Sequence, residues 1–480
     1  LRKAVLFGYF PATSREPGRM LPRGIVFTCL SHDVIAHEVT HALLDGMYRM
    51  LLEPSNPDVL AFHEAFADIV ALFQHFSMPE VLKSQIARTR GDLASQNLLG
   101  QLAQQFGEAT GRHGALRDAL GEVNPQTKRW EPRIPDPALL DTVFEPHARG
   151  SILVAAVFDA FLAMYRSRIA DLLRIATAGS GQLPAGELQP DLVNRLAEEA
   201  AKSAGHVLTM CIRALDYCPP VDLTFGEYLR ALITADFDLV RDDDLGYRTA
   251  FIEAFRRRGI YPRDVRTLSE GSLVWQPPAV FSSAMPDLSE MCEVREMLRE
   301  WTLSTNRGLI RSRVGDARRQ FRARLQERLK PGEEKELGLN FTDLGPEPPP
   351  TAARLGRARW DVSAVRPARR VGPDGQLRTD LVVELTQSRW QPVEGPGALA
   401  GQGGFWFRGG CTLVFDLESG VARYCIRKDI NSEARLGRQR DFLTGGAVPS
   451  LQATYFGTLE AGGEPFAFLH GDPDGAQELP

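Results

Sequence analysis

The chain has 480 residues, of which 43% are hydrophobic and 24% are charged, and this is the composition of an ordinary globular protein. The formal net charge of −5 at pH 7 excludes a generally basic nucleic-acid-binding protein. The 6 cysteines form no CxxC pair, which excludes a disulfide-dense secreted scaffold and a thiolate zinc site. At this length we expect two or three domains.

The first residues predict a strand or hairpin that enters a larger structure. Residues 1–28 carry short apolar runs around a turn-rich stretch. The chain begins at Leu1 rather than at methionine, so we expect upstream sequence to be missing. No signal stretch follows, and the compartment therefore stays unknown, although the absence of a disulfide framework favours the cytoplasm.

The longest part of the chain, residues 29–265, has helical periodicity and is rich in alanine and leucine. Its longest apolar run, 152–165, is interrupted by Asp159 and is too short to span a bilayer. We therefore expect a mainly α domain with buried helices and no membrane partner.

Two regions of different composition follow. Residues 266–350 start irregular, become a charged helix over about 290–329 and end in a proline-rich run, which predicts a linker. Residues 351–480 predict a separate small α+β domain, which is the candidate site for a protein partner. Its strand-like runs are at 381–386, 411–416 and 421–427.

The sequence His37-Glu-Val-Thr-His41 is an HExxH motif. On a helix the two histidines lie on one face a turn apart, so both imidazoles can bind one Zn²⁺. Glu38 points about 100° away from His37, within reach of an attacking water. Leu44 and Met47 occupy the positions of the glycine and histidine that metzincins require, so that class is excluded. Two surface histidines on an ordinary helix remain the alternative.

A second apolar helix is predicted from Asp58 to about residue 76. The face opposite its apolar stripe carries Glu64 and Asp68 among alanines, and carboxylates buried there need a cation or strong donors. Glu64 would complete a His2Glu zinc site with an open fourth position, and Asp68 would accept the ring N–H of a ligand histidine. His63 stays open as an alternative ligand, and a solvated face for both acids is the metal-free alternative.

The segments HEVTHA at 37–42 and EAFAD at 64–68 resemble the gluzincins, specifically the thermolysin-like metalloendopeptidases. That family carries HExxH on one helix and ExxxD on the next. Asp33 and Asp45 also stand where the family has acids, and the resemblance covers residues 31–76. It implies a mainly α catalytic domain of thermolysin-like type.

The chain departs from this family in three places. The stretch after ExxxD begins at His75 and lacks the acids that bind calcium in thermolysin, so calcium is not carried over. The family's helper tyrosine is represented only by Tyr48, more than a turn beyond the second histidine. Most of the β-rich first lobe is absent, and residues 1–28 would be its last hairpin.

A further histidine, His147, precedes the apolar helix that begins near residue 152. In thermolysin-like enzymes a histidine in a similar His-x-x-Gly-x-Ile setting stabilises the oxyanion, and the resemblance assigns this role to His147. Asp141 or Glu145 would orient its ring, and Arg149 would add positive charge to the same site. Taken alone, a capping or turn histidine is the ordinary interpretation.

The sequence as a whole leads us to expect a zinc-dependent metalloendopeptidase acting on a peptide or protein substrate. Zn²⁺ is the expected cofactor, with Glu38 as general base and His147 as oxyanion donor. Two alternatives stay open. One is a catalytically silent gluzincin-fold binding or scaffold protein. The other is a zinc aminopeptidase, for which the chain lacks a GxMEN-like segment.

Overall fold

The structure is a computed structural model, and the chain divides into two compact units. The helical unit comprises Leu1–Arg49, Leu60–Leu215 and Tyr228–Leu273, and the sheet unit comprises Met50–Val59, Asp216–Glu227 and Val274–Pro480. The structure describes residues 5–13, 21–95, 98–102, 117–119, 121–124, 126–127, 130–277, 288, 291–343, 345–349, 359–372, 375–393 and 403–444.

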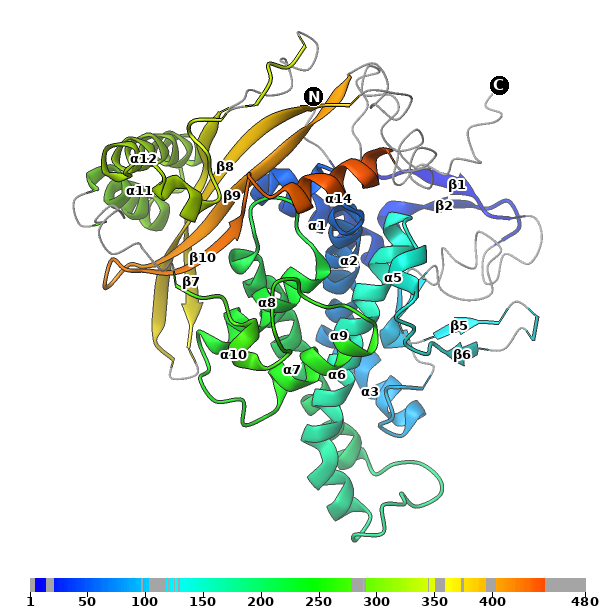
Figure 1. The fold of residues 1–480 in the computed structure, drawn as a ribbon. Helices are drawn as coiled ribbons and strands as arrows, with labels where there is room; N and C mark the ends of the chain where they lie inside the picture. Colours follow the sequence, from blue (N-terminus) through cyan, green and yellow to red (C-terminus); the bar gives the residue numbers. More distant parts are fainter. Residues whose placement is uncertain are drawn as a thin grey trace. The chain divides into compact units, whose positions relative to one another are not determined.

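The helical unit is built mainly from α-helices with a few short strands (Figure 1). Its helices are α1 (His32–Met47), α2 (Pro57–Gln74), α3 (Pro79–Thr89), α5 (Leu139–Thr142), α6 (Pro146–Ala176), α7 (Pro190–Ala214), α8 (Phe225–Phe237), α9 (Tyr247–Arg257) and α10 (Glu270–Leu273). Its strands are β1 (Tyr9–Pro11), β2 (Ile25–Phe27), β3 (Gln101–Leu102), β4 (Arg117–Asp118), β5 (Gly121–Val123) and β6 (Trp130–Pro132). The antiparallel pair β1–β2 is the hairpin expected near the start of the chain.

The long helix α6 contains the apolar run 152–165 and packs against α7 and α9. Phe158 and Phe161 of α6 are buried, and the Phe161 ring meets Phe73 of α2 edge-on at 5.6 Å. By length and composition α6 and the segment Pro57–Ser77 could each cross a membrane, but 78% and 83% of their apolar windows are buried inside the protein. Such burial is typical of core helices.

The sheet unit contains a four-stranded antiparallel sheet in the order β10-β9-β8-β7. Its elements are α11 (Cys292–Leu303), α12 (Arg307–Arg328), β7 (Trp360–Val371), β8 (Leu377–Pro392), β9 (Gly404–Asp416), β10 (Ala422–Lys428) and α14 (Glu433–Thr444). The strand runs predicted from the sequence lie within β8, β9 and β10, whereas β7 was not expected. Residues 445–480 of the predicted α+β domain lie outside the described residues.

The helices α11 and α12 lie together beside the sheet, where the sequence predicted one charged helix in a linker (Figure 1). The break between them falls before Asn306, whose side chain accepts a hydrogen bond from the Leu309 N–H and caps α12. Phe321 and Leu325 of α12 share an apolar core with the sheet strands. The region is therefore part of the sheet unit, because a narrow apolar stripe on a charged helix is enough to pack it there.

Two short segments, 50–59 and 216–227, belong to the sheet unit although the chain around them belongs to the helical unit. The buried carboxylate of Asp222 connects both segments to β10 and α14. It accepts hydrogen bonds from Ser55 (2.8 Å), Asn56 (2.7 Å) and Arg435 (2.9 Å), and Lys428 Nζ lies 3.6 Å away. Burial alone would raise the pKa of Asp222, but Lys428 and Arg435 hold it well below its usual value.

Candidate metal centre

The helix α1 presents its polar side to the protein interior. Ser31 caps its first turn by accepting a hydrogen bond from the Val34 N–H. His37 and His41 are buried at 6% and 5% exposure, whereas the apolar Leu43 on the other side of the helix is 61% exposed. The alternative of two surface histidines is therefore wrong.

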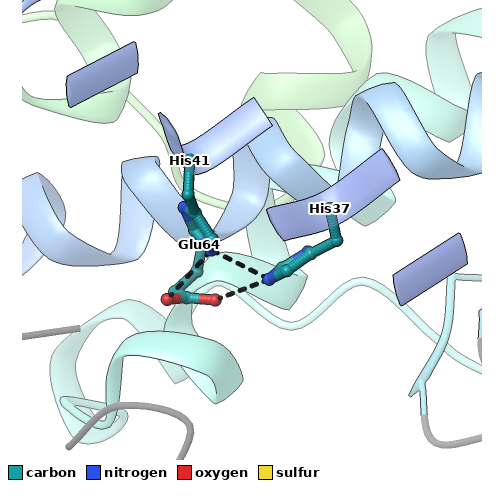
Figure 2. A group of neighbouring side chains, drawn as sticks. All are labelled: His37, His41 and Glu64. Carbon is teal, nitrogen blue, oxygen red and sulfur yellow. Dashed lines mark hydrogen bonds and ion pairs between the residues drawn. The ribbon is translucent and has the colours of Figure 1, made fainter. Parts of the chain in front are cut away.

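The two histidines meet a carboxylate from α2. The Nε2 atoms of His37 and His41 are 2.9 Å apart, and Glu64 places Oε2 3.4 Å from the first and Oε1 3.6 Å from the second. These ligand atoms lie within 4.8 Å of one another, so the group could hold a metal ion (Figure 2). Among the residues that the structure describes, no other group of three such side chains is this close.

The donor set and its spacing fit a small cation. Ligands about 2.0 to 2.1 Å from a tetrahedral centre stand about 3.3 Å from one another. The two Nε2 atoms are 2.9 Å apart, and each has a different oxygen of Glu64 at 3.4 or 3.6 Å, which are distances of this size. Glu64 is completely buried, which by itself would raise its pKa. The neighbouring His41 and His147 outweigh burial, so the pKa of Glu64 lies well below its usual value and the side chain is a carboxylate. The solvated-face alternative for Glu64 is therefore wrong.

Each histidine of the group is held through its other ring nitrogen. Asp68, one turn after Glu64 and 4% exposed, places Oδ1 2.8 Å from Nδ1 of His37, as the sequence predicted. His63 places its Nδ1 2.6 Å from Nδ1 of His41. His63 thus lies on the far side of the His41 ring from Glu64, and not within the ligand group.

His147 reaches the group from the start of α6. Its Nε2 lies 3.2 Å from Glu64 Oε2, and its Nδ1 lies 2.8 Å from Glu145 Oε1. Of the two predicted orienting acids, Glu145 makes this contact, whereas Asp141 lies exposed on α5. Glu145 also caps α6 by accepting hydrogen bonds from the backbone N–H groups of His147 and Ala148. Burial would raise the pKa of Glu145, but the hydrogen bond with the His147 ring, the charge of His147 and the two backbone hydrogen bonds together lower it below its usual value.

A close contact between α6 and α2 sets the position of His147. At Gly150 an added Cβ would lie 2.8 Å from the backbone oxygen of Ala61 and 3.2 Å from the backbone nitrogen of Ala65. Only a glycine allows the two helices to approach this closely. The small residues on α2 and the glycine after His147 therefore act together to bring the imidazole to Glu64.

Three further predicted residues, Glu38, Arg149 and Tyr48, are buried or half-buried. Glu38 is half-buried on α1 between the two histidines. Arg149 is buried, and its Nη1 donates to the carbonyls of Leu140 and Val143, which ties the α5–α6 turn together. Tyr48 is buried at the C-terminal end of α1.

Asp33 and Asp45, the acids on either side of the HExxH motif, have different surroundings. Asp33 Oδ1 lies 2.8 Å from Nε2 of His75, so this carboxylate pairs with an imidazole. Asp45 is exposed on α1.

No family model, no curated protein and no solved structure matches the chain. The structure itself shows a helical unit with a buried His2Glu group that could hold a metal ion, and a second unit with an antiparallel sheet.

Proposed function

We propose that the protein is a zinc-dependent metalloendopeptidase of the thermolysin-like gluzincin type. The observation that carries the proposal is the convergence of His37, His41 and Glu64 from two helices, with a fourth side chain, His147, directed at the same carboxylate. Two imidazoles and one carboxylate are the ligand set of catalytic zinc sites that keep a position open.

Zinc is the metal that this donor set favours, because nitrogen and carboxylate oxygen in tetrahedral arrangement suit Zn²⁺. When bound, it supplies a Lewis acid that polarises a carbonyl and lowers the pKa of water. His37, His41 and Glu64 would hold it. The carboxylate of Asp68 keeps the proton of His37 on Nδ1, which leaves the Nε2 lone pair for the ion.

Two side chains of the protein handle protons and charge in the proposed reaction. Glu38 accepts a proton from the attacking water and passes it to the leaving amine. Glu145 accepts a hydrogen bond from Nδ1 of His147 and fixes the ring, and Nε2 of His147 is the proposed donor to the oxyanion that forms beside Glu64. Loss of one such donor commonly costs about 3 kcal/mol in the transition state.

The test uses internally quenched peptides whose two ends are acetylated and amidated. We expect the zinc-loaded protein to cleave them, and we expect Glu38→Gln to bind zinc normally while losing about 10² to 10⁴-fold in kcat. Glu80→Gln, an exposed acid in the first turn of α3, is the matched control and should cleave like the wild type.

Three results would contradict the proposal. Full turnover by Glu38→Gln would show that Glu38 is not the general base. Cleavage only of peptides with a free amino terminus would indicate an aminopeptidase. Zinc binding without cleavage of a diverse blocked-peptide library would indicate a catalytically silent binding protein.

A further inference from the structure

The feature that the proposed reaction does not use is His63, a completely buried imidazole on α2 next to Glu64. Its Nδ1 lies 2.6 Å from Nδ1 of His41, and the two ring centroids lie 4.7 Å apart with planes 20° apart, which allows an in-plane hydrogen bond between the rings. We propose that His63 is a positioning residue, which selects the tautomer of His41 that can bind the metal. This inference rests on the metal site of the proposed function.

The contact requires one proton shared between two nitrogens. When both rings are neutral, two nitrogens 2.6 Å apart must have one donor and one acceptor. If His41 is the donor, its Nε2 carries the lone pair that faces His37 and Glu64, and His63 carries its own proton on Nε2. If His63 is the donor, the proton of His41 lies on Nε2 and occupies the metal position. The tautomers of the two rings are therefore coupled.

The two ligand histidines consequently differ in how firmly their tautomer is fixed. A carboxylate can only accept, so Asp68 permits a single tautomer of His37. An imidazole can accept or donate, so His63 permits both tautomers of His41. We expect His41 to populate both tautomers without metal and only the Nδ1–H tautomer with Zn²⁺ bound, when His63 becomes the acceptor.

The experiment measures zinc affinity and tautomer separately from peptide cleavage. Zinc affinity is measured by competition with a chromophoric chelator in the wild type, His63→Phe, His63→Gln and His206→Phe. His63→Phe removes the acceptor, and we expect its zinc affinity to fall about 10- to 100-fold. His63→Gln offers an amide oxygen and should restore most of the affinity. His206, an exposed histidine on α7, is the matched control and should have no effect.

Long-range ¹H–¹⁵N spectra of histidine-labelled wild type report the tautomers directly, whether or not the variants fold. The inference is wrong if zinc-loaded protein carries the proton on Nδ1 of His63, or if His63→Phe folds and binds zinc as the wild type does. Wild type that binds zinc with the expected tautomers but cleaves no peptide would refute the proposed function and leave this inference standing. Wild type that binds no zinc would refute both.

Discussion

Replacing Gly150 by alanine tests whether the α2–α6 contact positions the candidate site. The new methyl group would lie 2.8 Å and 3.2 Å from backbone atoms of Ala61 and Ala65, which cannot rotate away. Alanine gains up to about 1 kcal/mol of helix propensity over glycine. Overpacking of this kind costs about 1 to 3 kcal/mol. The net change is therefore a loss of about 0 to 2 kcal/mol.

A second glycine separates the two effects. Gly205 lies inside α7, and an added Cβ there would meet nothing within 4 Å. Gly205→Ala should therefore gain the helix propensity without a clash. The two variants are expected to differ by about 1 to 3 kcal/mol in the free energy of unfolding, measured by urea titration with circular dichroism.

Gly150→Ala also separates metal binding from the placement of His147. All three proposed ligands lie on α1 and α2, so Gly150→Ala should retain zinc affinity while its peptide cleavage falls as α6 moves away. Equal urea midpoints for Gly150→Ala and Gly205→Ala would refute the reasoning, since the clash would then cost nothing.

Two further predictions concern buried carboxylates. Asp68→Asn should lower zinc affinity about 10- to 100-fold because the amide no longer fixes one tautomer of His37, and an unchanged affinity in chelator competition would contradict this. Asp222→Asn should lower the free energy of unfolding by about 3 to 5 kcal/mol at pH 7, because it removes the carboxylate that faces the buried Arg435, whereas Lys428 keeps Glu227 at 2.7 Å. Since the folded state holds the pKa of Asp222 low, its contribution is complete above the unfolded-state value of about 3.9 and is lost as the pH falls through the folded value. Urea midpoints between pH 3 and 7 should therefore vary less in the variant, and parallel profiles would contradict the assignment.

The ligand group could be predicted because it depends on helical spacing. The HExxH spacing places His37 and His41 on one side of a helix, and the alanines around Glu64 indicate a face that another helix approaches closely. The acid that orients His147 could not be chosen in this way. Glu145 takes this place because it also caps α6, which fixes its carboxylate beside the ring.

Contacts between elements that are far apart in the chain could not be predicted from the sequence. The contact of His63 with His41 depends on how α1 lies on α2. The strand β7 was missed because several arginines interrupt its alternation. Two of these arginines form ion pairs: the buried Arg370 lies 3.0 Å from Asp380, and the half-buried Arg366 lies 2.6 Å from Glu384. Paired charges of this kind give a buried strand the sequence pattern of a polar loop.

The segment that joins α1 and α2 belongs to the sheet unit. Glu53 pairs with Arg408 of β9, and Ser55 and Asn56 bond to Asp222, whose counter-charges come from β10 and α14. A chain cut after residue 273 would keep every proposed ligand and lose these anchors. The contacts that hold the segment between α1 and α2 are therefore made with residues more than 160 positions further along the chain, within the sheet unit.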